Sequence, residues 1–105
     1  MSKSGVPVFG IGPVTERDLT GYVRDVARAF GWRRYHTWIS KHSAAGFPDE
    51  VLIRPPRLIF AELKSDSGKL SADQQAWLED LRGVPGIEVY VWRPGDMDEI
   101  AQVLR

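Results

Sequence analysis

The chain of 105 residues contains no cysteine and only two histidines. Without thiols it can form neither disulfides nor thiolate metal sites, and two imidazoles alone do not complete a structural zinc site. No stretch approaches the roughly 20 consecutive apolar residues that a membrane-spanning helix needs, and the N-terminal MSKSGVPVFGIG lacks the apolar segment of a secretion signal. We therefore expect a protein of a reduced, cytoplasmic setting, with no membrane association.

The chain also lacks a net charge, but its charges are unevenly distributed. Residues 1–57 carry nine Lys and Arg against five Asp and Glu, and residues 58–105 carry five against nine. A basic surface on the first half would suit phosphate binding, and ordinary solvated side chains would explain the same counts. Composition leaves both interpretations open. The basic residues concerned are mainly Arg33, Arg34, Lys41, Arg54 and Arg57.

The length predicts one compact domain, with residues 1–14 as a tail or arm and residues 15–105 as the folded part. Apolar residues at three–four spacing predict a helix over residues 16–30, with Thr15 as N-cap and Asp18 at the third helical position. Residues 32–39 are rich in aromatic and β-branched side chains and predict a strand. Residues 40–48 have the composition of a loop.

The second half predicts two strands, a helix, a strand and a helix. The strands cover residues 50–54 and 58–64 on either side of a double proline, and a helix over residues 72–82 begins after an N-cap at Ser71. A strand over residues 87–92 and a helix over residues 97–104 follow. The order α-β-β-β-α-β-α indicates an α/β fold with a mixed central sheet flanked by helices.

The double proline also predicts which residues of the hairpin face each other. If the hairpin closes symmetrically around it, Asp49 faces Glu62, with their Cβ atoms about 4.5–5.5 Å apart. Two carboxylates at that distance repel each other unless a positive group lies between them, and a divalent cation is suited to this place. Strand alternation puts Lys64 on the same face as Glu62, where an ammonium group can orient and activate the water that attacks a phosphodiester. These hard oxygen donors favour Mg²⁺ or Mn²⁺ over zinc.

The wider pattern resembles a known family. A PD pair is followed after twelve residues by E-x-K, as in the PD-(D/E)xK nuclease superfamily, and the stretches GFPD, IFAELK, KLSADQQAW and VYVWRP resemble the VRR-NUC (virus-type replication and repair nuclease) family over about residues 15–104. The resemblance implies a restriction-endonuclease-like core and Mg²⁺-dependent cleavage of DNA, with Mn²⁺ able to substitute. It further implies a role in DNA repair, branched substrates such as Holliday junctions, a homodimer, and a setting in the cytoplasm of a bacterial or phage-infected cell.

The resemblance also implies roles for particular residues. Asp49, Glu62, Lys64 and Gln74 match the catalytic positions. Metal ligands would be Asp49, Glu62 and the backbone carbonyl of Leu63, with Glu16 on the first helix as a further candidate.

Each of these residues has an ordinary structural explanation as well. The charged group on the hairpin could be a surface ion-pair cluster, which contributes little stability. Ser71 and Gln74 have the spacing of a capping box, and Glu16 is favourable at any helix N-terminus. Candidate phosphate contacts, each also explained as solvated surface, are Arg33, Arg34, His36, Lys41, His42 and Lys69. Core packing is the default for the four tryptophans Trp32, Trp38, Trp77 and Trp92.

Three other functions compete with a structure-selective endonuclease. One is a nickase or flap-cutting subunit of a larger complex. Another is a non-catalytic nucleic-acid-binding module that keeps the nuclease fold. The third is a protein-interaction domain with a coincidental motif, which would show no dependence on metal.

Overall fold

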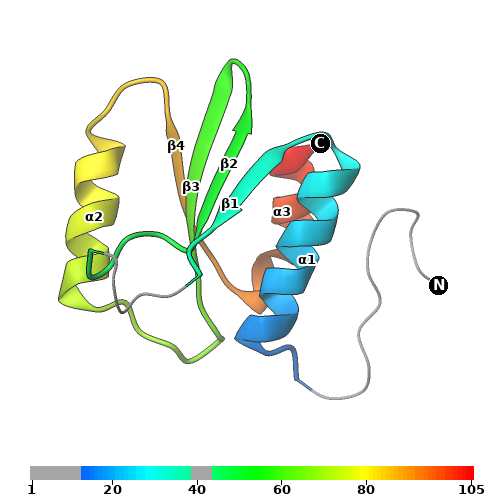
Figure 1. Ribbon diagram of the computed structural model, residues 1–105. Helices are drawn as coiled ribbons and strands as arrows, with labels where there is room; N and C mark the ends of the chain where they lie inside the picture. Colours follow the sequence, from blue (N-terminus) through cyan, green and yellow to red (C-terminus); the bar gives the residue numbers. More distant parts are fainter. Residues whose placement is uncertain (1–12, 39–43) are drawn as a thin grey trace.

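The computed structural model describes residues 13–38 and 44–105, and it has three layers (Figure 1). A central sheet has one helix on one face and two helices on the other, which confirms the predicted class and element order. The elements are α1 (Glu16–Ala29), β1 (Arg33–His36), β2 (Glu50–Arg54), β3 (Arg57–Leu63), α2 (Ala72–Arg82), β4 (Glu88–Trp92) and α3 (Met97–Leu104), with a 3₁₀ turn at Pro94–Asp96. The first strand is shorter than predicted, and β2, α2 and α3 have the predicted bounds.

The sheet has the strand order β1-β2-β3-β4, in which the first three strands are antiparallel and β4 runs parallel to β3. The β2–β3 hairpin closes symmetrically around the cis Pro55-Pro56 bond, with Arg54 opposite Arg57 and Glu50 opposite Ala61. This is the predicted register. It is strongly specified because a slip by one residue would turn every side chain of the strand to the other face.

The main core lies between the sheet and the helices α1 and α3. The apolar stripe of α1 contributes five buried residues, and Thr15 and Asp18 form the predicted capping box at its start. The sheet contributes the side chains that alternate toward this face, and α3 closes the end of the core. The buried apolar residues of this cluster are Leu19, Tyr22, Val23, Val26, Ala27, Trp32, Leu52, Ile59, Ala61, Leu63, Trp92, Ile100 and Leu104.

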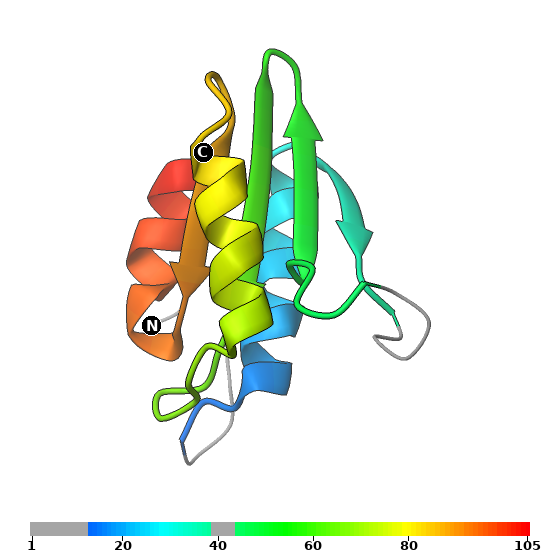
Figure 2. The same ribbon diagram turned by 90° about the vertical axis from the view of Figure 1, so that its left-hand side faces the viewer.

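Helix α2 covers only part of the opposite face. Figure 2 shows α2 lying over β3 and β4, while β1 and much of β2 extend beyond it. Phe47, from the loop before β2, bridges sheet and helix through edge-to-face contacts with Phe60 and Trp77, at centroid distances of 6.2 and 5.1 Å. On the uncovered part of the face Tyr35 is 62% exposed.

Trp38 corrects the expectation that all four tryptophans pack in the core. It lies just after β1 and is 85% exposed, whereas Trp32 and Trp92 are buried and Trp77 is half-buried. The strand ends at His36, so Trp38 is no longer held against a neighbouring strand by a continuous ladder.

Arg54 and Arg57 hold the end of α3 and are not part of an open basic surface. Arg54 donates hydrogen bonds to the carbonyls of Phe30, Leu104 and Arg105, and Arg57 donates to the Val103 carbonyl. Both guanidinium groups also lie over the Trp32 ring, whose Nε1 donates to the Leu104 carbonyl at 2.8 Å. Carbonyls at a helix C-terminus have no partner within the helix, and these three side chains provide donors for them.

No helix of the described residues is long and apolar enough to cross a membrane.

Candidate active site

The hairpin brings Asp49 and Glu62 together at the end opposite its turn. Glu50 pairs with Ala61, so the next facing pair outward is Asp49 and Glu62. The Asp49 carboxylate accepts a hydrogen bond from the backbone N–H of Leu63 at 2.9 Å, which ties the residue to the end of β3. On its other side, Thr37 donates its backbone N–H to the Asp49 carbonyl and its hydroxyl to the Pro48 carbonyl. Hydrogen bonds therefore join the Pro-Asp pair to the end of β3 on one side and to the residue after β1 on the other.

Glu62 is a buried carboxyl group with one satisfied oxygen. It is 2% exposed, and its Oε2 accepts a hydrogen bond from Gln74 Nε2 at 2.8 Å. Its Oε1 is buried and has no hydrogen-bond partner in the described structure. Burial, followed by the charge and close contact of the Asp49 carboxyl, raises the pKa of Glu62 to about 8. Two acceptor groups thus face each other where only a proton or a cation can satisfy both.

Gln74 makes side-chain hydrogen bonds with both Ser71 and Glu62. Its Oε1 accepts from the backbone N–H of Ser71 at 2.8 Å, while its backbone N–H donates to the Ser71 hydroxyl, so the predicted capping box is formed. Because that contact uses the amide oxygen, the amide nitrogen is directed at Glu62. The start of α2 therefore holds Glu62 in place.

Lys64 belongs to the same group. It is half-buried at the end of β3, and its positive charge acts against the rise in the pKa of Glu62. The structure thus brings together Asp49, Glu62, Lys64 and Gln74, the four residues to which sequence reasoning gave catalytic roles. A hard divalent cation suits the donors, because two adjacent carboxyl groups include a buried oxygen that has no donor.

Arg34 and His36, two of the candidate phosphate contacts, are both bonded to a buried carboxylate. Arg34 donates two hydrogen bonds to Glu50, at 2.6 and 2.9 Å, and His36 Nδ1 lies 2.6 Å from the same carboxylate. Glu50 is completely buried, on the sheet face opposite Glu62. A buried carboxylate needs such partners, so both side chains are committed to holding β1 against β2.

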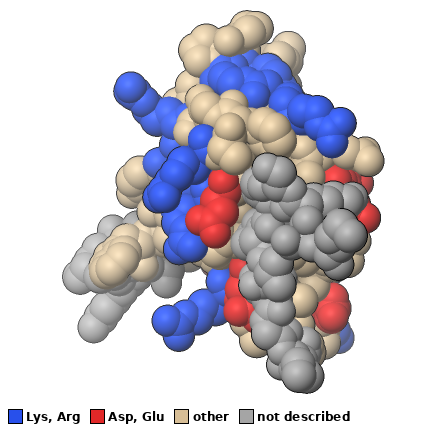
Figure 3. All heavy atoms as spheres, turned by 90° about the vertical axis from the view of Figure 1, so that its right-hand side faces the viewer, with Lys and Arg blue, Asp and Glu red and all other residues tan. Residues whose placement is uncertain are grey.

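The remaining candidates are dispersed. Glu16 is exposed in the first turn of α1, and the described residues contain no group of three or more His, Asp or Glu side chains that could hold a metal ion. Arg33 and Lys69 are exposed. On the face shown in Figure 3, Lys and Arg side chains gather over the upper part and along one edge, with Asp and Glu among them and below. Lys41 and His42 lie outside the described residues.

Gly46 shapes the loop that carries the Pro-Asp pair. Its φ is +85°, and a Cβ at this position would lie 2.4 Å from the backbone carbonyl carbon of Asp73 and 2.6 Å from the backbone nitrogen of Gln74. Only glycine permits both this conformation and this approach. The sequence predicted a loop here, and the structure shows that this loop packs closely against the first turn of α2.

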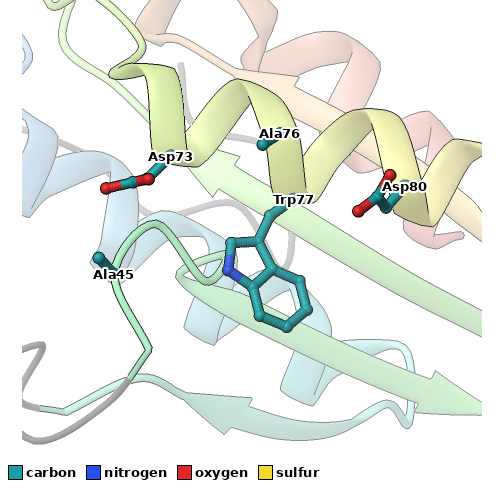
Figure 4. A pocket seen from close by; sticks show the side chains of 5 residues that line it. All are labelled: Ala45, Asp73, Ala76, Trp77 and Asp80. Carbon is teal, nitrogen blue, oxygen red and sulfur yellow. The ribbon is translucent and has the colours of Figure 1, made fainter.

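A shallow pocket of about 170 Å³ lies beside this loop, lined by Ala45, Asp73, Ala76, Trp77 and Asp80. Figure 4 shows the Trp77 ring reaching from α2 toward the loop, with Asp73 opposite Ala45. The pocket contains none of the four clustered residues. Its two carboxylates repel phosphate, so it does not extend the site toward nucleic acid.

Comparison with protein families identifies the class of protein. The model of the VRR-NUC domain matches residues 15–94, so the chain belongs to this family. The family indicates a nuclease-type function, with DNA as the suggested substrate. Neither a curated protein nor a solved structure matches the chain.

Proposed function

We propose that the chain is a divalent-cation-dependent DNA endonuclease whose active site consists of Asp49, Glu62, Lys64 and Gln74. The observation that carries this proposal is the buried Glu62 Oε1, which has no hydrogen-bond partner and lies beside a second carboxyl group. A folded chain rarely keeps a buried acceptor without a partner unless the site has another use. Mg²⁺ is the cation that best suits this donor set, and Mn²⁺ can substitute for it.

In this proposal each residue has a distinct task. A cation, when bound, would supply positive charge where the scissile phosphate gains negative charge. Asp49 and Glu62 would hold it, together with the Leu63 carbonyl at the end of β3. The Lys64 ammonium orients the attacking water by hydrogen bonding, and Gln74 keeps Glu62 from rotating out of the site.

The proposed substrate is branched DNA, cut by a homodimer with two sites, because a two-fold dimer can cut both strands of a symmetric junction. Support for a DNA surface next to the site comes from the part of the sheet that α2 leaves uncovered. Tyr35 lies on the same sheet face as Asp49, and exposed aromatic rings can stack on unpaired bases. Arg33 and Lys69 are exposed and suit phosphate contacts.

Cleavage of labelled four-way, flap and duplex DNA tests the proposal. We expect the wild-type chain to cut in Mg²⁺ or Mn²⁺ but not in EDTA, with preference for the branched substrates. Glu62→Ala and Lys64→Ala should each abolish cutting, while Glu88→Gln, a carboxylate change on β4 at the Arg57 ion pair, should not. DNA binding without cutting in either metal would leave a non-catalytic binding module. Absence of both cutting and metal stabilisation would favour an interaction domain.

A further inference from the structure

Arg93 lies outside the cluster of Asp49, Glu62, Lys64 and Gln74. The proposed chemistry gives this charged residue no role. It directly follows Trp92, the last residue of β4. Its Nη1 donates hydrogen bonds to the carbonyls of Ser65 and Gly68, at 2.6 and 2.7 Å. These two residues begin and end the turn that follows Lys64, so one guanidinium group fastens both ends of that turn. Hydrogen bonds from a charged donor are among the stronger ones in proteins.

The turn itself is compact and touches the lysine side chain. The backbone N–H of Gly68 donates to the Ser65 hydroxyl at 3.0 Å. A Cβ at Gly68 would lie 3.0 Å from the same hydroxyl and 3.4 Å from Lys64 Cδ. The hydrocarbon part of Lys64 therefore packs against the turn, and the position of the turn limits where the ammonium group can lie.

Arg93 is fixed on its own side as well. Its backbone N–H donates to the Asp96 carboxylate at 2.8 Å. The neighbouring Trp92 carbonyl accepts the backbone N–H of Lys64 at 3.0 Å, so the chain is joined to β4 immediately before the turn. Lys64 is thus held at its backbone by Trp92 and along its side chain by the turn that Arg93 fastens.

We propose that Arg93 is a positioning residue that sets the place of the Lys64 ammonium beside Glu62 by fastening the Ser65–Gly68 turn. This inference rests on the proposed nuclease function for its effect on catalysis. Arg93 itself is not expected to contact the substrate, because the Arg93 guanidinium is already directed at the carbonyls of Ser65 and Gly68. Misplacement of a catalytic group by about 1 Å can lower a rate by about 10²-fold, and an effect of that order on kcat is expected when the turn is released.

Arg57 is a matched control. It too donates to a backbone carbonyl, that of Val103 at 2.8 Å, and it also pairs with Glu88, but it lies at the hairpin turn, at the far end of β3 from Lys64. We expect Arg93→Ala to lower kcat by on the order of 10²-fold with little change in KM for DNA. Arg93→Lys, which keeps a cationic donor, should retain more activity than Arg93→Ala, and added guanidinium ion should partly rescue Arg93→Ala. Arg57→Ala should lower the melting temperature with little effect on kcat.

Amide hydrogen exchange gives a readout that needs no activity. In Arg93→Ala the Gly68 and Lys64 amides should exchange faster, while amides at the β2–β3 turn keep their wild-type rates. An equal fall in kcat for Arg93→Ala and Arg57→Ala at similar stability, or unchanged Gly68 exchange, would overturn the inference. A wild-type chain that cuts no DNA would instead refute the proposed function, and the exchange measurement would still decide whether Arg93 fastens the turn.

Discussion

Replacing Glu62 with glutamine should change how the stability of the metal-free chain depends on pH. The folded chain raises the pKa of Glu62 from its ordinary 4.5 to about 8, so this group binds its proton more tightly when folded than when unfolded. Its contribution to stability is then complete below pH 4.5 and is lost as the pH rises through about 8. Glu62→Gln cannot ionise, and it keeps an oxygen that can accept the hydrogen bond of Gln74.

The size of the effect follows from the shift. Each pKa unit corresponds to about 1.4 kcal/mol, so the rise from 4.5 to about 8 corresponds to at most about 5 kcal/mol across the whole window. The wild-type chain should therefore lose several kcal/mol relative to Glu62→Gln between pH 5 and pH 9 in EDTA. Mg²⁺ should restore much of the lost stability at pH 8. A cation that binds only the folded state stabilises it by about 2.7 kcal/mol when the free cation concentration is a hundred times the Kd.

Urea denaturation of both proteins at several pH values in EDTA measures this difference directly. Glu88→Gln is the matched control, because the hydrogen bond with Arg57 holds the pKa of Glu88 below its ordinary value. The stability that Glu88 contributes is present above that ordinary value and is lost only at acid pH, so this variant should follow the wild type from pH 6 to 9. Parallel curves for wild type and Glu62→Gln over that range would refute the picture of a carboxyl pair that retains a proton.

Three further predictions concern the surroundings of single residues. Arg34→Ala should lower the free energy of unfolding by about 3–5 kcal/mol because it removes the main partner of the buried Glu50 carboxylate. Arg33 is an exposed neighbour, so Arg33→Ala should change the free energy of unfolding by no more than about 0.5 kcal/mol. The same Arg33→Ala change should weaken DNA binding in a fluorescence-anisotropy titration. Gly46→Ala should destabilise the chain more than Gly86→Ala in thermal melts, since both have φ of +85° but only Gly46 faces backbone within 3 Å. Trp38, being 85% exposed, should be quenched strongly by acrylamide, and branched DNA should protect it; quenching unchanged by bound DNA would exclude this ring from the DNA surface.

The sequence predicted those parts of the site that depend on local periodicity. Strand alternation and the double proline fixed the register that places Asp49 opposite Glu62, because a slip would expose the apolar face of the hairpin. The spacing of Ser71 and Gln74 predicted a capping box, and the structure shows that the same amide also reaches Glu62. Both features depend on residues close in sequence or paired through a short turn.

Contacts between distant segments could not be predicted in this way. Arg34 and His36 were candidates for phosphate contacts because the sequence does not show that Glu50 is buried between them. The contacts of Arg93 depend on how the parallel strand β4 aligns with β3, and no hairpin turn specifies that alignment. Arg54 likewise reaches the end of α3, 50 residues away, only after the sheet and helices have packed.

Asp49 and Glu50 are consecutive residues with opposite surroundings. One side chain lies at the candidate cation site, and the next enters the ion network with Arg34 and His36 on the opposite face of the sheet, which α1 and α3 cover. A single peptide unit therefore connects two polar centres that share no side-chain contact in the described structure. Anyone transplanting this site to another scaffold would have to carry both centres, because a scaffold with an apolar residue in place of Glu50 would lose the anchor that orients its neighbour.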